Sequence, residues 1–186
     1  MQPKQVYENL ATLSDGTLAE RSRLGDADAF AELYQRYLPP VYRFLFKRTG
    51  GNVALAEDLT SQVFLEALDN LPNYHERGYF AAWLFTIARR RLADHHRSNK
   101  MVFLEEIPET VFGISDNPED RENMERLKQL LAAMDDEKRE VLQLRFSAEL
   151  SFADMAIVLG KSESAVKMSL YRVLDWLRSQ WEAGNE

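Results

Sequence analysis

Apolar residues recur at intervals of three and four along most of the chain, and this spacing predicts α-helices rather than strands. Pro39 and Pro40 predict that one helix ends and another begins there, because proline fits the first turn of a helix but not its interior. Asn52 follows two glycines and is placed to cap a third helix. The helices expected in this half cover about residues 26–38, 40–49, 53–71 and 79–97, with a polar loop over 72–78.

The second half of the chain begins after a break in the pattern. Residues 98–117 contain proline and glycine and show no sustained periodicity, so we interpret them as a linker. Asn117 and Pro118 mark the start of the next helix as N-cap and first helical residue, and Asp135 or Asp136 caps the helix that follows. The chain is therefore predicted to be all-α, with two small four-helix domains joined by a flexible linker.

A helix-turn-helix pattern lies near the C-terminus. Ser151 and Asp154 form a capping box that opens a short helix, and Gly160 supplies the left-handed residue that ends it. Ser162 is placed to cap a longer helix whose buried stripe begins at Val166. Helix-turn-helix proteins use this layout to place the second helix in a major groove, although an ordinary helical hairpin shows the same periodicity.

Residues of this second helix that point away from the buried stripe are candidates for DNA contact. Their lysine and arginine side chains, together with the N–H groups at the start of the helix, suit phosphates. The candidates for binding duplex DNA are Ser162, Ser164, Lys167, Met168, Tyr171 and Arg172.

A second candidate surface combines aromatic and basic residues. Trp83, Arg90 and Arg97 recur every seven residues on the helix over 79–97, with further arginines beside them, and a polar loop with one tyrosine precedes this helix. Unstacked bases stack on aromatic rings and guanidinium planes. The alternative is that Trp83 covers the hydrophobic core and the arginines lie at a solvated helix C-terminus, where the helix dipole favours cations.

The helix over 53–71 carries a polar stripe. Asp58, Gln62, Glu66 and Asp69 fall within about 80° of one another at 100° per residue. For an isolated helix, such a stripe is an ordinary solvated face.

The charge distribution separates the segments. The chain has 186 residues and a net charge of −7. Residues 89–100 contain five basic and one acidic side chain, whereas residues 101–120 contain six acidic and no basic ones, so the linker is acidic. No apolar run has the length of a membrane span or resembles a signal peptide, which predicts a soluble intracellular protein.

Nothing in the sequence indicates catalysis or a cofactor. The chain contains no cysteine, which excludes disulfides and thiolate metal sites. His95 and His96 are neighbours and point about 100° apart on a helix, so they cannot readily share one metal ion. No glycine-rich phosphate loop is present. We expect no enzyme activity, no metal and no cofactor.

Several motifs in fixed order carry a more specific signal. They are Ala56–Thr60 with Val63–Leu65, Phe80 with Trp83–Arg89, Glu140–Phe146, Ser151-Phe152 with Leu159-Gly160, and Ala165–Lys167. Over about residues 20–180 the chain resembles an extracytoplasmic-function (ECF) sigma factor of the bacterial sigma-70 family. The resemblance implies a cytoplasmic initiation factor that binds core RNA polymerase and promoter DNA and is controlled by an anti-sigma factor.

The resemblance also assigns roles along the chain. Residues 20–97 would be sigma region 2, residues 98–117 the linker, and residues 118–182 sigma region 4, which reads the −35 element with the six residues named above. The −10 element would be bound by Asn73, Tyr74, His75, Arg77, Trp83, Arg89, Arg90, Asp94 and Arg97. Core polymerase would be bound by Asp58, Gln62, Glu66 and Asp69.

The chain departs from the family at three positions. It has Asp135 where proline is common, Ser169 where arginine is common, and Arg90 where asparagine is frequent. The second departure predicts a lost phosphate contact at the −35 element, and the third leaves open which base Arg90 meets. Two alternatives remain at this stage: a stand-alone helix-turn-helix regulator that binds duplex operators, and a helical adaptor without promoter selectivity.

Overall fold

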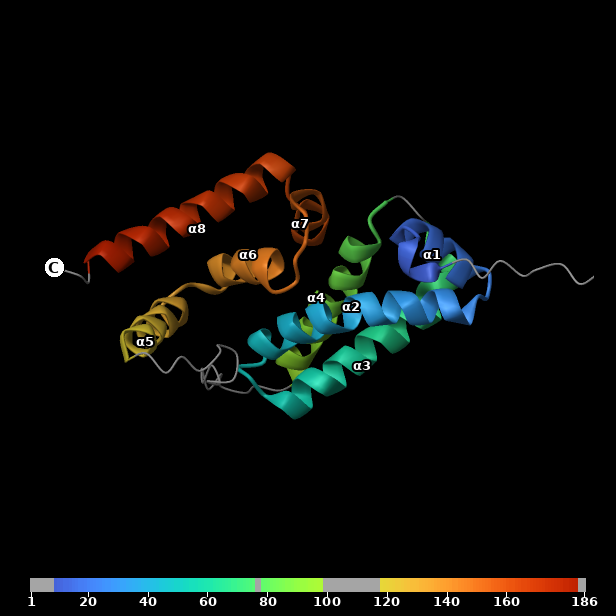
Figure 1. Cartoon of the computed structure of the whole chain (residues 1–186), viewed down its shortest axis with the longest axis horizontal. Coiled ribbons are helices and arrows are strands. Elements are labelled where there is room, and N and C mark those ends of the chain that lie inside the picture. Colours follow the sequence, from blue (N-terminus) through green and yellow to red (C-terminus); the bar gives the residue numbers. More distant parts are fainter. Residues whose placement is uncertain (1–8, 76–77, 99–117, 184–186) are drawn as a thin grey trace, which may run out of the picture.

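The computed structural model describes residues 9–75, 78–98 and 118–183, and every regular element within these ranges is helical. The first group consists of η1 (Leu10–Thr12), α1 (Asp15–Arg23), α2 (Ala27–Arg48), α3 (Val53–Asn70), η2 (Leu71–Asn73) and α4 (Phe80–Ser98). The second group consists of α5 (Pro118–Ala132), α6 (Asp136–Phe146), α7 (Phe152–Leu159) and α8 (Glu163–Ala183). Figure 1 shows the two groups side by side, with α7 next to α4. The all-α prediction is confirmed.

One predicted break is wrong, because α2 runs without interruption through Pro39 and Pro40. Two prolines inside a helix remove two backbone hydrogen bonds and crowd the preceding turn, at a cost of about 3 kcal/mol each. The buried stripe of α2 explains why the helix continues, since Leu33 lies before the prolines and Val41 and Phe44 lie after them, all nearly inaccessible to solvent. Packing on both sides of the prolines therefore outweighs their local preference.

The sequence pattern also missed α1. This helix has nine residues and buries only Leu18, Ala19 and Ser22, so its apolar positions are too few to show a period. Its start is fixed by Ser14, whose hydroxyl accepts a hydrogen bond from the N–H of Thr17.

The predicted helix caps are confirmed wherever the structure describes them. The side chains of Asn52, Asp135, Ser151 and Ser162 each accept a hydrogen bond from the backbone N–H three residues further on. Gly160 ends α7 with φ of +64°, a conformation that costs a side-chain-bearing residue free energy. The predicted cap at Asn117 lies outside the described residues, as does the predicted linker over 98–117 apart from Ser98, which is the last residue of α4.

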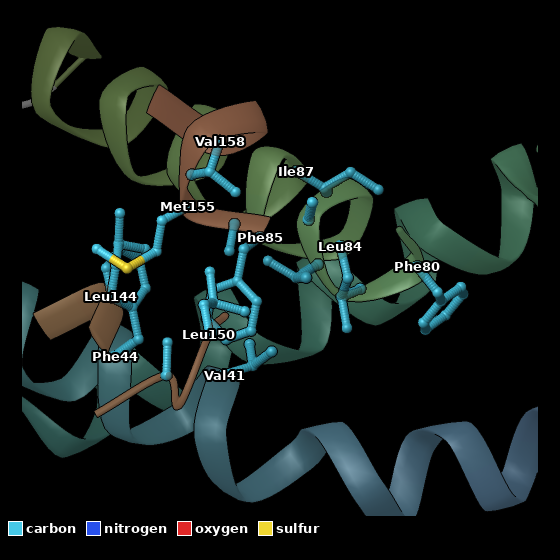
Figure 2. Packing of buried hydrophobic residues seen from close by; sticks show 14 of the residues in the cluster. Val41, Phe44, Phe80, Leu84, Phe85, Ile87, Leu144, Leu150, Met155 and Val158 are labelled. Carbon is cyan, nitrogen blue, oxygen red and sulfur yellow. The ribbon is translucent and has the colours of Figure 1, made fainter. Parts of the chain in front are cut away.

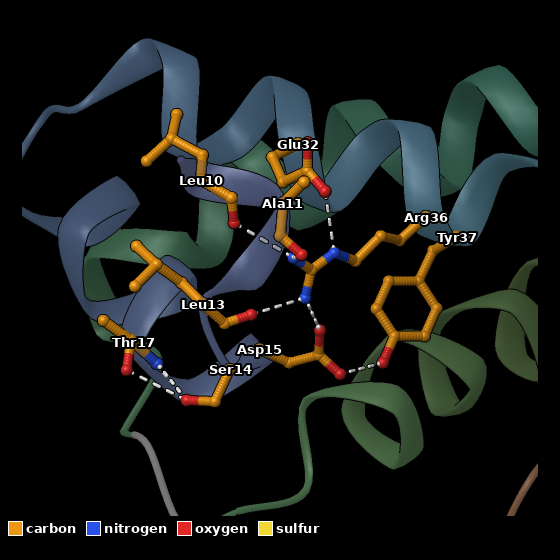
Figure 3. A network of polar contacts seen from close by, with 9 residues as sticks. All are labelled: Leu10, Ala11, Leu13, Ser14, Asp15, Thr17, Glu32, Arg36 and Tyr37. Atoms are coloured by element: carbon orange, nitrogen blue, oxygen red, sulfur yellow. Dashed lines mark hydrogen bonds and ion pairs between the residues drawn. The ribbon is translucent and has the colours of Figure 1, made fainter. Parts of the chain in front are cut away.

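A single arginine fixes the N-terminal segment to α2 (Figure 3). The Arg36 guanidinium donates hydrogen bonds to the carbonyl oxygens of Leu10, Ala11 and Leu13 at 2.8–3.1 Å, and to carboxylate oxygens of Asp15 and Glu32 at 2.9 Å. The Tyr37 hydroxyl donates to the other Asp15 oxygen at 2.6 Å. Burial and this carboxylate raise the pKa of Tyr37.

Buried apolar side chains of the two groups form one continuous hydrophobic cluster. In Figure 2, side chains of α2 and α4 meet side chains of α6, α7 and the segment between them. Within the second group, the predicted stripe of α8 is buried at Val166, Leu170 and Val173. The described helices therefore pack as one body.

Candidate nucleic-acid and polymerase interface

The start of α4 is an aromatic cluster. The Tyr74 ring lies 4.7 Å from the ring of Trp83 and 5.7 Å from that of Phe80, between centroids, and only 8% of Tyr74 is exposed. Trp83 packs against the core as well. The Tyr74 ring therefore completes the core beneath the loop in this structure, and its role at the −10 element stays a prediction.

The loop before α4 is polar and exposed where it is described. Asn73 and His75 are exposed, and a 2.9 Å hydrogen bond joins the Asn73 carbonyl and His75 Nδ1. Tyr79 follows with 43% of its surface exposed, so its ring is accessible to solvent. Tyr79 stands beside the loop but was not among the residues predicted for this site. Arg77 lies outside the described residues.

A buried carboxylate holds two arginines of α4. Glu66 lies on α3 with 9% exposure and forms ion pairs with both Arg90 and Arg91. The guanidinium of Arg90 is more than half exposed and remains available to solvent on its other side. The prediction that Glu66 shares the exposed polar stripe of α3 is wrong, because pairing with two cations turns it inward.

Further along α4 the charged residues differ in accessibility. Asp94 and Arg97 pair with each other one turn apart and are both exposed. Arg89 instead reaches the second helical group, where its Nε and Nη2 donate to Glu140 at 2.6 and 3.0 Å and its Nη1 donates to the Val158 carbonyl at 3.1 Å. These bonds raise the pKa of Arg89.

The outer face of α3 combines polar and apolar side chains. Asp58 and Asp69 are exposed, and Gln62 donates a hydrogen bond to Asp58 at 2.8 Å. Leu65 and Leu68 lie on the same face with 63% and 47% exposure. The two leucines were missed from sequence because they fall within an apolar pattern that otherwise marks buried positions. An acidic and apolar strip of this kind suits a protein surface that is basic and partly apolar.

The outer face of α8 presents a mixed set of side chains. Ser164, Met168, Tyr171 and Arg172 are exposed at spacings of four, three and one. Lys167 is partly occupied by contacts within region 4, since its ammonium group pairs with Glu163 at 2.5 Å and lies 5.4 Å from the centre of the Phe152 ring. Ser162 is committed to the helix cap. Four of the six predicted residues therefore form one open face.

Two family models match this chain, one over the part that carries α3 and α4 and the other over the part that carries α8. Residues 33–101 match the family model for sigma-70 region 2, and residues 124–177 match the one for sigma-70, region 4. The ECF RNA polymerase sigma factor ShbA of Streptomyces griseus subsp. griseus is 31% identical over 179 residues, which cover 88% of this chain and 93% of ShbA. The chain belongs to the ECF sigma factors.

Other ECF sigma factors differ in length. BldN of Streptomyces coelicolor is 39% identical over 164 residues, which cover 84% of this chain but 62% of BldN. The chain thus spans less than two thirds of that relative. A solved structure of CnrH in complex with the cytosolic domain of CnrY matches 91% of this chain and 97% of that chain, with a TM-score of 0.64 and 24% identity. At this identity the likeness supports the fold.

The two sigma-70 regions of this ECF sigma factor touch each other. The region 2 match contains α3, α4 and most of α2, and the region 4 match contains α6, α7 and most of α5 and α8. Contacts of Arg89 with Glu140 and Val158 therefore join one region to the other. No helix among the described residues is long and apolar enough to cross a membrane, and no group of three potential metal ligands occurs among them.

Proposed function

We propose that this ECF sigma factor binds core RNA polymerase, directs it to promoters with −10 and −35 elements and melts the −10 element. The observation that supports this most directly is the presence, in one chain, of an exposed recognition face on α8 and an aromatic-basic helix α4. A duplex-binding regulator needs the first surface but has no use for the second. Aromatic and arginine side chains suit bases that have left the duplex, because stacking contributes about 1–3 kcal/mol per base.

We assign the −10 element to residues 20–97, in region 2. Its exposed contacts are Asn73, His75, Arg90, Asp94 and Arg97, with Trp83 at the edge of the core. Arg77 and Arg89 join them, the latter once it leaves Glu140. Tyr79 is added for its exposed ring.

We assign the −35 element to residues 118–182, in region 4, and give residues 98–117 the role of a linker. Ser164, Met168, Tyr171 and Arg172 are the exposed contacts on α8, and Ser162 and Lys167 lie beside them. Ser169 is half-buried at the edge of this face. Because it stands where arginine is common in the family, the face lacks that basic side chain.

The α3 face is assigned to core polymerase. Asp58, Gln62 and Asp69 supply charge and hydrogen bonds, and the exposed Leu65 and Leu68 supply apolar area beside them. Burying an exposed leucine on binding contributes roughly 1–2 kcal/mol. Glu66 leaves the assigned set, because its carboxylate is buried between two arginines.

Control by an anti-sigma factor completes the proposal. Its support is that CnrH, which has this fold, was solved in complex with the cytosolic domain of CnrY. The protein then acts in the cytoplasm alongside polymerase, as a specificity subunit without catalysis of its own.

The test separates the two DNA surfaces from the polymerase surface. Leu65→Ala/Leu68→Ala should weaken binding to purified bacterial core polymerase at least tenfold, whereas Asp28→Ala, at an exposed position of α2, should not. Tyr171→Ala/Arg172→Ala should retain core binding and lose −35 protection in a footprint. Gln180→Ala is its control, since Gln180 is exposed and lies about 180° around α8 from Tyr171. A footprint on duplex DNA without polymerase, and no binding to core, would favour the operator-binding regulator.

A further inference from the structure

The ion pair of Glu66 with Arg90 joins the helix assigned to polymerase to the helix assigned to DNA. Glu66 belongs to α3, which exposes Leu65 and Leu68, but its own carboxylate is buried and meets α4. One carboxylate oxygen, Oε1, pairs with Nη2 of Arg90, and the other, Oε2, accepts a hydrogen bond from Nε of Arg91. A single buried carboxylate therefore holds two neighbouring guanidinium groups of α4.

The two arginines differ in how much solvent they reach. The Arg91 side chain is 37% exposed and the Arg90 side chain 58% exposed. A buried carboxylate needs one cation to balance its charge, and the less exposed Arg91 supplies it. The bond to Arg90 exceeds what neutralisation of Glu66 requires. Its effect is to fix the position of a guanidinium group that otherwise faces solvent.

A second carboxylate that could direct Arg90 is already engaged. Asp94 lies one turn further along α4, and residues four apart on a helix are close enough to pair. Asp94 pairs with Arg97 instead. Glu66 is therefore the acidic group that sets the direction of Arg90. The two carboxylates and the three arginines, Arg91 included, leave a net charge of +1, so this part of α4 still attracts phosphates.

Arg90 shares an exposed face of α4 with an aromatic ring. Trp83, Thr86 and Arg90 are three and four residues apart, so they lie on one side of the helix. Thr86 is exposed, and its hydroxyl donates to the Ala82 carbonyl at 2.7 Å. A single strand along this face meets the tryptophan ring and, two turns later, the guanidinium group. Such a combination suits unstacked bases.

The geometry of the ion pair leaves a hydrogen-bonding edge for a base. Nη2 carries two N–H bonds, so a carboxylate on one of them leaves the other to form a fork with a neighbouring N–H of the same guanidinium group. Two parallel donors match the two acceptors of guanine, O6 and N7. Adenine offers only N7 at that edge, beside an amino group that is itself a donor. A fixed Arg90 therefore favours guanine over adenine.

We propose that Glu66 is a positioning residue for promoter recognition. It holds the Arg90 guanidinium group so that Arg90 selects guanine at one position of the melted −10 strand. The proposal rests on the proposed function in naming the −10 strand as the ligand. The positioning itself rests on the contacts of Glu66 with α4.

The first experiment measures base preference in the melted strand. Holoenzyme containing the full chain, either wild type or Arg90→Ala, transcribes a promoter library with a randomised −10 segment, and the comparison locates the position where a preference for guanine requires Arg90. Four templates then carry the four bases at that position, opposite an abasic site in a −10 segment already opened by mismatches. Guanine and adenine are both purines, so the ratio of their transcripts reports the hydrogen-bonding edge rather than stacking.

The wild type should transcribe the guanine template about tenfold better than the adenine template. Glu66→Gln keeps the size of the side chain but loses its charge, and the ratio should fall by about fivefold because Arg90 must then be ordered on binding. Arg90→Ala should abolish the preference, and adding Glu66→Gln to it should change nothing further. Glu32→Gln is the matched control, since this half-buried carboxylate pairs with Arg36 within α2; it should keep the wild-type ratio.

Each of three results would overturn the proposal. They are a wild-type ratio in Glu66→Gln, the absence of any position where a preference for guanine requires Arg90, and an equal loss of transcription from all four templates. The third would mean that Glu66 only supports the fold. If the wild type itself initiates on no template, the proposed function fails instead, and the positioning is decided by the second experiment.

The second experiment follows the Arg90 side chain in the free protein. NMR of the isotope-labelled full chain measures rotation about the Nε–Cζ bond of Arg90, with Arg90→Lys used to assign the signal. Rotation should be slow in the wild type and in Glu32→Gln, and the slow signal should be lost in Glu66→Gln. The same rotation rate in all three proteins would refute the positioning role of Glu66, whatever the transcription assay shows.

Discussion

The N-terminal segment provides a prediction that isolates one side chain. Arg36 joins residues 10–13 to both Asp15 and α2 through hydrogen bonds to three carbonyls and two carboxylates. Arg36→Ala removes all five. Four of them are part-buried, and each should contribute roughly 0.5–1 kcal/mol after water replaces it, so the free energy of unfolding should fall by about 2–4 kcal/mol.

The assay is urea unfolding followed by circular dichroism, together with amide hydrogen exchange over residues 10–23. Arg23→Ala is the matched control, because its guanidinium donates to Glu20 within α1 in two exposed hydrogen bonds, whose loss should not shift the midpoint. Arg36→Lys should fall between the two, since an ammonium group keeps the charge but not the planar fork. The reasoning is refuted if Arg36→Ala and Arg23→Ala unfold at the same urea concentration, or if exchange over residues 10–23 is unchanged.

Three further predictions concern other parts of the fold. Burial, and then the nearby charge of Arg48, lower the pKa of His96, so the unfolded chain binds a proton at this imidazole more readily than the folded chain. The free energy of unfolding should therefore decline as pH falls below about 6.5, and His96→Gln should reduce that decline in thermal melts at pH 7.5 and 5.5. Glu66→Gln should lower the free energy of unfolding in urea by about 1–2 kcal/mol, less than for a fully buried pair because its two arginines are partly exposed. It should leave the affinity for core polymerase within twofold, whereas Asp58→Ala should weaken that affinity without changing stability. Gly160→Ala should cost about 1–2 kcal/mol, because the site has space for a methyl group but a left-handed φ; an unchanged melting temperature would contradict this.

Local signals predicted much of this fold from sequence. Caps such as Asn52 and Ser151 act within three residues of themselves, and the left-handed Gly160 acts on its own turn, so neighbouring residues suffice to predict them. The continuous helix through Pro39 could not be predicted in the same way. The cost of the prolines is local, but the burial that outweighs it comes from packing of α2 against other helices, chiefly α1, α3 and α4.

In the candidate site as well, features set by neighbouring residues could be predicted from sequence, and features set by packing between elements could not. The exposed face of α8 follows from helical spacing, and five of the six predicted residues are exposed, with Lys167 half-buried. Three features of the site depend on contacts between separate elements, and spacing did not predict them. They are the packing of Tyr74 against Trp83, the ion pair of Glu66 with Arg90, and the hydrogen bonds of Arg89 to Glu140. Sequence spacing shows which side of a helix a residue occupies, but not which partner meets it there.

Transcription from mapped start sites tests the central claim most directly. Purified bacterial core polymerase would be given a pooled genomic template with and without the protein, and the transcript ends sequenced. The account predicts start sites that require the protein and share −35 and −10 motifs at constant spacing. With Tyr171→Ala/Arg172→Ala, the start sites should still share the −10 motif but should no longer share a defined −35 motif. Core polymerase from the source organism that binds the protein but initiates nowhere, or initiates at the same sites without it, would contradict the account.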